Sequence, residues 1–419
     1  MIKPANVGII GMGGFAGWHH NTVAKLEETN QAKLICTCDP NAAAFATEQQ
    51  NWKLADRGVS VFPHYRQMLD VCGKELDLLV VPTPINLHRE MHRAGVEAGI
   101  PVYLEKPPTL DYRELEEMIT LDQQARKSTL VAFNFIVEQP RIALKQRLLH
   151  GEFGAIKGAN LMAHWPRPAD YFKRVSWAGR LMMDDRVVLD SCFGNANAHF
   201  VHNLLFWLGS GEISSWAQIS TVQAELYRSH AIEGADTFFV QADTTGGHTM
   251  RFAVTHACAG QTSHSETILC EKADLHYIVG RHAEIRWHDG RSERIEVGPF
   301  DGLTKNHLAY YRYLRGESNR PATSLVDSRP FVILNDLAHV SSGQISAIPA
   351  ERITHVRDEK EQKDYINVAG MTGAIDRFLQ KGDWPGAHGW NRETGAKVTV
   401  HDLSRFHETV RSMLAAVVR

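Results

Sequence analysis

The chain has 419 residues, of which 43% are hydrophobic and 22% are charged, and its formal net charge is −3. This length allows two or three domains, and the composition is that of an ordinary globular protein. The balanced charge without a basic stripe argues against nucleic-acid binding, and no apolar run is long enough to cross a membrane.

The first residues lead directly into a predicted strand at 7–10, so we expect no signal peptide and a cytoplasmic location. The six cysteines do not have the spacing of a zinc or redox motif, and we expect them to be reduced and buried. His199 and His202 could hold a metal from one helical face, but no further ligands accompany them. We therefore expect no metal site.

The predicted strand 7–10 ends in Gly11-Met-Gly-Gly-Phe-Ala16, and a helix is expected to follow as far as Glu28. This is the G-x-G-x-x-A pattern of dinucleotide-binding folds. Gly11 permits a tight turn, Gly13 lets backbone N–H groups approach a pyrophosphate, and Ala16 allows close packing of helix and strand. The helix N-terminus then presents unpaired N–H groups to the phosphates.

Strand-like and helix-like segments alternate over the first 135 residues, with further strands expected at 32–38, 59–62, 76–81, 101–104 and 129–133. This alternation predicts a doubly wound parallel sheet of the Rossmann type in a domain spanning residues 1–135. Ligands bind at the carboxyl ends of the strands in such sheets. The residues at these ends are Gly11, Asp39, Thr83, Glu105 and Asn134.

Asp39 closes the second predicted strand, where a carboxylate binds the adenosine ribose hydroxyls in dinucleotide sites. The alternative is that Asp39 only caps the turn formed with Pro40 and Asn41. A carboxylate would repel a 2′-phosphate, and no arginine follows it. NAD is therefore favoured as the cofactor over NADP.

Several motifs occur in order along this domain: the glycine-rich turn with His19, then Asp39, then Thr83-Pro84 with His88, and finally Glu105-Lys106-Pro107 at the end of the fifth strand. Together they resemble the Gfo/Idh/MocA oxidoreductases. The resemblance implies that NAD is bound by Gly11, Gly13, Gly14, Phe15, Ala16, Asp39, Thr83, Pro84, His88, Glu105, Lys106 and Asn134. It also implies that Pro107 orients Lys106 toward the nicotinamide, and a cis peptide bond between the two residues is one way to do so.

After residue 135 the pattern changes to strands that alternate apolar and polar residues, which predicts an antiparallel sheet in an α+β domain spanning 136–352. By the resemblance, this open sheet serves substrate binding and assembly, so a homo-oligomer, a dimer or a tetramer, is expected. Residues 353–419 form a C-terminal extension in which we predict helices at 365–380 and 401–418.

The segment before the helix at 203–209 holds the predicted acid/base residue, His199, by its match to the family's D-x-G-x-H pattern. The position of the family's aspartate is Asn195 in this chain. Either Asn195 binds the substrate hydroxyl without a charge, or Asp190 supplies the carboxylate. Arg174 and Trp177, from a polar and aromatic loop, are further candidates for substrate binding, although a surface loop anchored by its aromatic residues explains them equally well.

Oxidation of an alcohol requires a base for the hydroxyl proton, and histidine is suited to this because its ordinary pKa lies near neutrality. Lys106 would donate a hydrogen bond to the reacting oxygen, and the two roles are assigned in reverse in some members of the family. The sequence thus predicts an NAD-dependent oxidoreductase acting on a hydroxyl of a sugar, cyclitol or glycoside. The alternatives are an NAD-dependent glycosidase and a non-enzymatic NAD-binding regulator.

Overall fold

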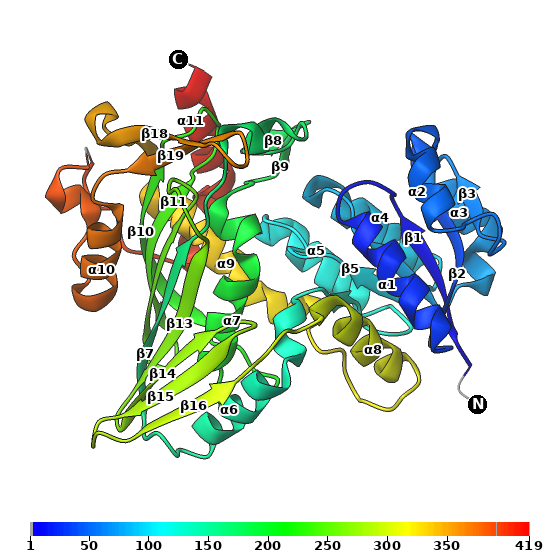
Figure 1. The fold of residues 1–419 in the computed structure, drawn as a ribbon, viewed down its shortest axis with the longest axis horizontal. Coiled ribbons are helices and arrows are strands. Elements are labelled where there is room, and N and C mark those ends of the chain that lie inside the picture. The colour runs from blue at the N-terminus through cyan, green and yellow to red at the C-terminus, as the bar shows by residue number, and fades with distance from the viewer. Residues whose placement is uncertain (1–2, 391, 419) are drawn as a thin grey trace. The chain divides into compact units, whose positions relative to one another are not determined.

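The computed structural model describes residues 3–390 and 392–418, and it divides the chain into two compact units (Figure 1). Both units are discontinuous in sequence. Unit 1 comprises Met1–Thr109, Arg113–Glu138 and Asp301–Ser328, and unit 2 comprises Leu110–Tyr112, Gln139–Phe300 and Arg329–Arg419. Residues 301–328, which the sequence analysis assigned to the second domain, therefore belong to unit 1.

Unit 1 contains a parallel sheet with the strand order β3-β2-β1-β4-β5-β6, which confirms the predicted Rossmann-type fold. The strands are β1 (Ala5–Ile10), β2 (Ala32–Cys38), β3 (Ser60–Phe62), β4 (Leu78–Val81), β5 (Val102–Leu104) and β6 (Leu130–Val131). The helices between them are α1 (Ala16–Glu28), α2 (Ala46–Asn51), α3 (Tyr65–Cys72), α4 (Ile85–Glu97) and α5 (Tyr112–Asp122). The apolar runs form the central strands because helices cover parallel sheets on both faces.

Helix α8 (Gly302–Leu314) completes the core of unit 1, although it lies far from the other elements in sequence. Tyr310, Tyr311 and Tyr313 pack in the same apolar cluster as the residues of β1, β2 and β4. Beyond this helix, the carbonyl of Thr323 accepts a hydrogen bond from the backbone N–H of Val131 in β6, at 2.9 Å. The late segment is thus an integral part of the parallel-sheet fold of unit 1.

Unit 2 contains a ten-stranded, mostly antiparallel sheet, as predicted, with the order β16-β15-β14-β13-β7-β12-β11-β10-β17 and β20 beside β10. The pairs β7–β12 and β10–β17 are parallel. The strands are β7 (Ile156–His164), β10 (Ile219–Arg228), β11 (Thr237–Thr244), β12 (Thr249–Thr255), β13 (Ser263–Cys270), β14 (Ala273–Ile278), β15 (His282–Trp287), β16 (Ser292–Glu296), β17 (Ile345–Ala347) and β20 (Val398–Thr399). A short hairpin is formed by β8 (Met182–Met183) and β9 (Arg186–Val187).

A fully buried ion pair ties the helices α6 (Gln139–Leu149) and α7 (Ala198–Leu208) to strand β13. Glu266 of β13 accepts a hydrogen bond of 2.6 Å from Nη1 of Arg141 in α6. It also accepts bonds from Asn203 Nδ2 and Trp207 Nε1 of α7, at 2.8 and 2.6 Å. Because Asn203 and Trp207 both belong to α7, their hydrogen bonds to this carboxylate fix the rotation of α7 about its own axis.

The longest helix, α9 (Leu325–Ser342), follows later in the chain.

The C-terminal extension packs against strands of the large sheet. Its elements are the hairpin β18 (Ile353–Asp358) and β19 (Lys363–Val368), then α10 (Met371–Lys381) and α11 (Phe406–Val418). Phe378 and Trp390 lie in one apolar cluster with Tyr227 of β10 and Phe239 of β11. Buried Glu225 of β10 binds the extension by accepting bonds from the Gly386 N–H and the Thr394 hydroxyl.

The predicted helix at 365–380 is wrong in its first part. Residues up to Val368 form strand β19, which pairs with β18, and helix α10 begins only at Met371. Tyr365 and Ile366 favour a strand because aromatic and β-branched side chains pack well on a pleated surface. Gly370, with φ of 81°, then separates strand from helix. The helix predicted at 401–418 is present as a 3₁₀ turn followed by α11.

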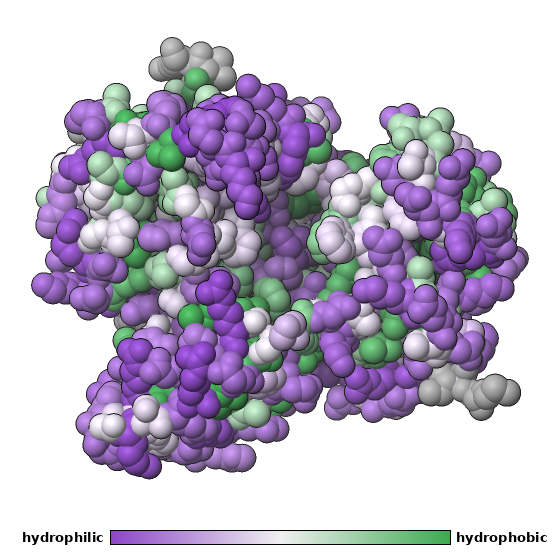
Figure 2. Space-filling model, viewed as in Figure 1, coloured by the Kyte–Doolittle hydropathy of each residue, from purple (hydrophilic) through white to green (hydrophobic). Residues whose placement is uncertain are grey.

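The surface visible in Figure 2 is mostly hydrophilic, and apolar side chains occur on it in small separate patches. No helix within residues 3–390 and 392–418 has the length and apolar character that crossing a membrane requires. All six cysteines are buried and form no disulfide.

Candidate functional site

The turn between β1 and α1 has the backbone geometry that a pyrophosphate site requires. Gly11 and Gly14 have φ of 102° and 56°, in the region that favours glycine. A Cβ atom on Gly13 would lie 3.0 Å from the ring of Phe45, which is tighter than an ordinary contact, so a larger residue would require Phe45 to shift. Helix α1 then begins at Ala16 without a side-chain cap, although the N–H groups of Ala16 and Trp18 already donate to the carbonyls of Gly13 and Phe15, each at 3.1 Å.

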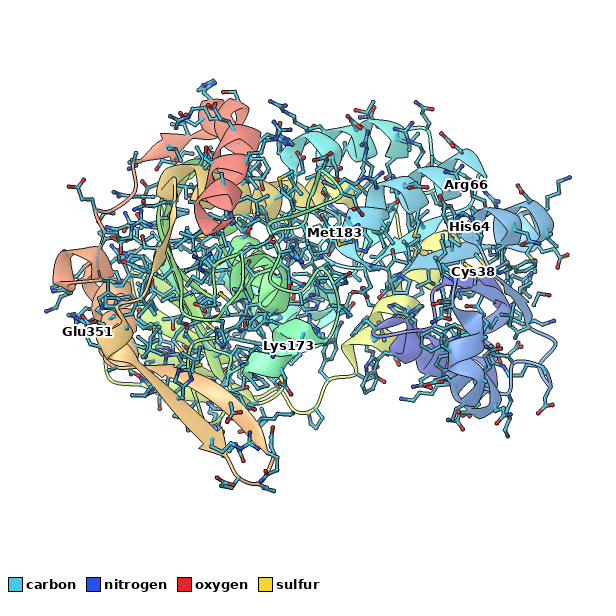
Figure 3. All side chains as sticks on the ribbon, turned by 90° about the horizontal axis from the view of Figure 1, so that it is seen from above. Cys38, His64, Arg66, Lys173, Met183 and Glu351 are labelled. Atoms are coloured by element: carbon cyan, nitrogen blue, oxygen red, sulfur yellow. The ribbon has the colours of Figure 1, made fainter. Side chains whose placement is uncertain are left out.

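Asp39 lies beside this turn, at the carboxyl end of β2. Its Oδ2 accepts a hydrogen bond from the backbone N–H of Met12, at 3.0 Å, and its Oδ1 accepts one from Asn41, at 2.9 Å. The carboxylate therefore caps its own turn and at the same time joins the tips of β1 and β2. Each oxygen retains acceptor capacity for a ribose hydroxyl. Cys38, which precedes Asp39, is labelled in Figure 3 in the same part of unit 1 as His64, at the start of α3.

The turns after β4 and β5 are held together by the buried ring of His88. Its Nε2 lies 2.8 Å from the carbonyl oxygen of Thr83, and its Nδ1 lies 2.9 Å from that of Pro107 and 3.2 Å from that of Pro108. Burial lowers the pKa of His88. The Lys106–Pro107 peptide bond is cis. His88 thus acts through backbone contacts that place the Lys106 turn against the Thr83 turn.

A buried chain of polar groups reaches Glu105 from helix α8. His19 Nε2 lies 3.1 Å from Glu105 Oε1, and His19 Nδ1 lies 3.0 Å from His307 Nε2. His307 Nδ1 in turn lies 3.2 Å from the hydroxyl of Tyr311. The ring of Tyr103 stacks on His307, with centroids 4.4 Å apart. The four polar groups form a continuous line from α8 to the carboxyl end of β5.

One assignment of protons gives each of these four polar groups a hydrogen-bond partner, with Glu105 as a carboxylate. Tyr311 donates to His307, His307 donates to His19, and His19 donates to the carboxylate. Burial and the nearby His19 keep the pKa of His307 well below 6.5, which agrees with a neutral ring. The second oxygen, Oε2 of Glu105, accepts the backbone N–H of Lys106 at 3.2 Å. This line of hydrogen bonds therefore fixes the Glu105 carboxylate, which directly precedes the predicted catalytic lysine.

Sequence reasoning missed the contribution of α8 entirely. Besides His307 and Tyr311, this helix supplies Asn306, whose Nδ2 donates to Asn134 Oδ1 at 2.8 Å and to the Tyr103 hydroxyl at 3.1 Å. The dense run of amide, imidazole and phenol groups on one helix was the available signal. Nothing in the local pattern showed that it packs against a sheet formed 200 residues earlier.

In unit 2 the structure joins the two candidates that the sequence left as alternatives. Asn195 Nδ2 donates a hydrogen bond of 2.7 Å to Asp190 Oδ1. Asp190 Oδ2 accepts the Gly179 N–H, also at 2.7 Å. Asn195 lies in a wide helical turn at Cys192–Ala196, and His199 follows in the first turn of α7. Asp190 and Asn195 therefore form one hydrogen-bonded unit just before this helix.

The loop that precedes Asp190 brings together Arg174 and Trp177, which the sequence named as candidates for substrate binding. The guanidinium carbon of Arg174 lies 3.6 Å from the ring centroid of Tyr171 and 5.2 Å from that of Trp177. Lys173 and Met183, which Figure 3 labels, mark the two ends of this loop region. The candidates thus fall into two sets: the cofactor residues and Lys106 in unit 1, and Arg174, Trp177, Asp190, Asn195 and His199 in unit 2.

Comparison with known proteins adds direct evidence on the first set. The model of an oxidoreductase family with an NAD-binding Rossmann fold, GFO_IDH_MocA, matches residues 5–133. The matched residues are similar to the nucleotide-binding domain of the Gfo/Idh/MocA oxidoreductases. The match covers the whole parallel sheet with the glycine turn, Asp39 and Lys106.

Curated relatives of this family are distant. A glycosyl hydrolase family 109 protein from Shewanella amazonensis is 26% identical over 161 residues, which are 35% of this chain and 34% of that protein. An inositol 2-dehydrogenase from Rhizobium meliloti is 24% identical over 102 residues, 24% of this chain and 31% of that protein. The chain thus spans about a third of the length of these relatives.

Solved structures extend the likeness of the fold to both units. The WlbA dehydrogenase from Bordetella pertussis, solved with NADH and UDP-GlcNAcA, has a TM-score of 0.66 at 22% identity, over 81% of this chain and 96% of that one. A levoglucosan dehydrogenase, solved with NADH and levoglucosan, has a TM-score of 0.67 at 18% identity, over 81% and 97%. At these identities the comparison establishes the fold.

Proposed function

We propose that this protein belongs to the Gfo/Idh/MocA family and is an NAD-dependent oxidoreductase that acts on a secondary hydroxyl of a sugar, cyclitol or glycoside. The observation that carries the proposal is the carboxyl edge of the parallel sheet. There the glycine turn, Asp39 and the Glu105-Lys106-Pro107 turn follow three strands of the same sheet, β1, β2 and β5. Sheets of this type bind their ligands at this edge.

The residues at this edge fit a dinucleotide. The glycine turn would receive the pyrophosphate, the positive end of the α1 dipole would favour its charge, and Asp39 would accept the ribose hydroxyls. A 2′-phosphate on that ribose would meet the Asp39 carboxylate, so NAD is preferred over NADP. When bound, NAD supplies the acceptor for a hydride.

The remaining chemistry is a proton transfer, and we assign it to Lys106 and His199. Lys106 would hydrogen-bond the reacting oxygen and favour its developing negative charge. His199 would accept the hydroxyl proton as a general base. Asn195, held by Asp190 at 2.7 Å, is one turn earlier and would orient the substrate.

The test is the absorbance of reduced nicotinamide during incubation with NAD and a panel of sugars and cyclitols. The expected result is net NADH formation with at least one of them, lost in the His199→Ala variant. A protein that binds NAD but forms no NADH with any alcohol of the panel would contradict the proposal and would favour a regulatory role.

A glycosidase is the second candidate, because a relative is named as a member of glycosyl hydrolase family 109. Such an enzyme would oxidise the sugar transiently, eliminate the aglycone and reduce the sugar again. It would therefore release nitrophenol from a nitrophenyl glycoside without net NADH. The same assay separates the two functions.

We also propose a cytoplasmic homo-oligomer, a dimer or a tetramer, on the basis of the family resemblance. Analytical ultracentrifugation of the purified chain tests the assembly, and a monomer at micromolar concentration would contradict it.

A further inference from the structure

Four side chains of unit 2 form what we call the Arg–aromatic cluster: Arg167, Tyr171, Arg174 and Trp177. The guanidinium carbons of Arg167 and Arg174 lie 4.3 and 3.6 Å from the ring centroid of Tyr171, so that both cations contact one phenol ring. Arg174 also stacks toward Trp177, and its Nη1 donates to the carbonyl of Tyr171 at 2.8 Å. The cluster concentrates two positive charges in one short loop.

These two charges are not balanced by acidic side chains. Across the described parts of the chain, neither Arg167 nor Arg174 forms an ion pair, whereas Arg180 of the same loop pairs with Glu233 at 2.5 Å. The Nε atom of Arg167 is buried and has no hydrogen-bond partner. A buried guanidinium N–H without an acceptor costs free energy unless a ligand supplies one.

Asp190, the acidic group that acts on Tyr171, is already engaged by hydrogen bonds. Asp190 acts electrostatically on Tyr171, but its two carboxylate oxygens accept the Gly179 N–H and the Asn195 amide. Burial raises the pKa of Tyr171 above its ordinary value, so the ring between the arginines is a neutral phenol. The cluster therefore has a net positive charge beside the Asp190–Asn195 pair.

Arginines that stack on aromatic rings keep the N–H groups of the guanidinium plane free for ligands. Such planar forks match the two oxygens of a carboxylate or a phosphate. The aromatic faces add contact area that suits the ring of a sugar. The arrangement thus provides what an anionic carbohydrate needs and a neutral one does not.

We propose that the substrate of this enzyme carries an anionic group, a carboxylate or a phosphate, which binds between Arg167 and Arg174. The inference rests on the proposed function and specifies its substrate class. The adjacent Asp190–Asn195 pair then contacts hydroxyls of the same molecule. The Arg180–Glu233 pair plays no part in the recognition.

Equilibrium binding tests the inference independently of turnover. Glucose, glucuronate and glucose 1-phosphate are titrated into the full-length protein saturated with NAD, by calorimetry at low and high salt. We expect one of the two anions to bind about 10- to 100-fold more tightly than glucose, because charge-assisted bonds to a guanidinium contribute this much, and we expect salt to reduce the difference. Whichever anion binds more tightly identifies the carboxylate or the phosphate as the recognised group.

Variants locate the effect in the cluster. Arg174→Gln and Arg167→Gln should each lower the preference for the anion over glucose by about 10-fold or more, while Arg174→Lys should recover part of it. Arg180→Gln is the matched control and should change the preference less than twofold. Equal binding of all three ligands to the wild-type protein, or an unchanged preference in both glutamine variants, would overturn the inference. Neither result bears on the proposed function, which the assay of NADH formation tests separately.

Discussion

Replacement of Glu266 by glutamine should destabilise unit 2 more than any comparable change of an exposed carboxylate. Glu266 and Arg141 have no exposed side-chain surface, and the carboxylate accepts bonds of 2.6 Å from Arg141, 2.8 Å from Asn203 and 2.6 Å from Trp207. Glutamine has one acceptor oxygen and turns an N–H₂ group toward one of these donors. It also leaves the Arg141 cation buried without a counter-charge.

Breaking a buried pair by removing one partner costs about 3–5 kcal/mol, which is a large part of the ~5–15 kcal/mol that stabilises a typical domain. Because Asn203 and Trp207 belong to α7, we also expect the helix that carries His199 to become less well fixed. Turnover should therefore fall together with stability. Urea unfolding followed by circular dichroism measures the change in the free energy of unfolding.

Glu293→Gln is the matched control. Glu293 also pairs with an arginine, Arg147, but its side chain is 41% exposed, and Arg147 keeps a second partner in Glu152. Exposed pairs contribute about 0–1 kcal/mol, so this variant should unfold within that margin of the wild type. If Glu266→Gln lost no more stability than Glu293→Gln, the buried pair would not be what anchors α7.

Three further predictions concern the cofactor, the chemistry and the response to pH. Lys106→Met should abolish turnover and leave the Kd for NAD within a few-fold of the wild type by calorimetry; an equal loss of NAD binding would show that Lys106 is structural. Asp39→Ala should weaken NAD binding by about 10-fold or more, the loss of charge-assisted bonds to the ribose, and reduce the discrimination against NADP; an unchanged NAD/NADP ratio would refute the role of Asp39. Burial lowers the pKa of His20 to about 4, of His256 to about 3 and of His339 to about 4, from an unfolded value of 6.5. The unfolded state therefore binds more protons as the pH falls through 6.5, and each histidine should cost about 2 kcal/mol of stability at pH 5; equal urea midpoints at pH 7 and pH 5 would contradict this.

The nucleotide-binding part of the fold was predictable because its signals are local. A short apolar strand, a glycine turn and an amphipathic helix follow one another within 28 residues, and Asp39 and Lys106 each lie directly after a strand. The strand positions then bring these residues to one edge without any knowledge of long-range packing. The structure adds the hydrogen bonds that hold Asp39, and it leaves the predicted position of Asp39 at the end of β2 unchanged.

What the sequence did not reveal depends on contacts between distant segments. His307 lies 288 positions from His19, and no periodicity relates the two. Tyr365 was assigned to a helix because the apolar spacing of residues 365–380 fits a helix, yet pairing with β18 determines its strand conformation. Arg167 was not predicted as a site residue, because its significance depends on the ring of Tyr171 beside it.

The discontinuity of unit 1 has a consequence for how the protein is made in the cell. About 190 residues separate Glu138, the end of its second segment, from Ser328, the end of its third. At about 5–20 residues per second, a ribosome needs about 10–40 s to bridge that interval. For most of this time the nascent sheet lacks the tyrosines of α8, and its uncovered apolar surface is available to chaperones. Newly synthesised chains should accordingly acquire the ability to bind NAD only late in translation, well after the glycine turn has left the exit tunnel.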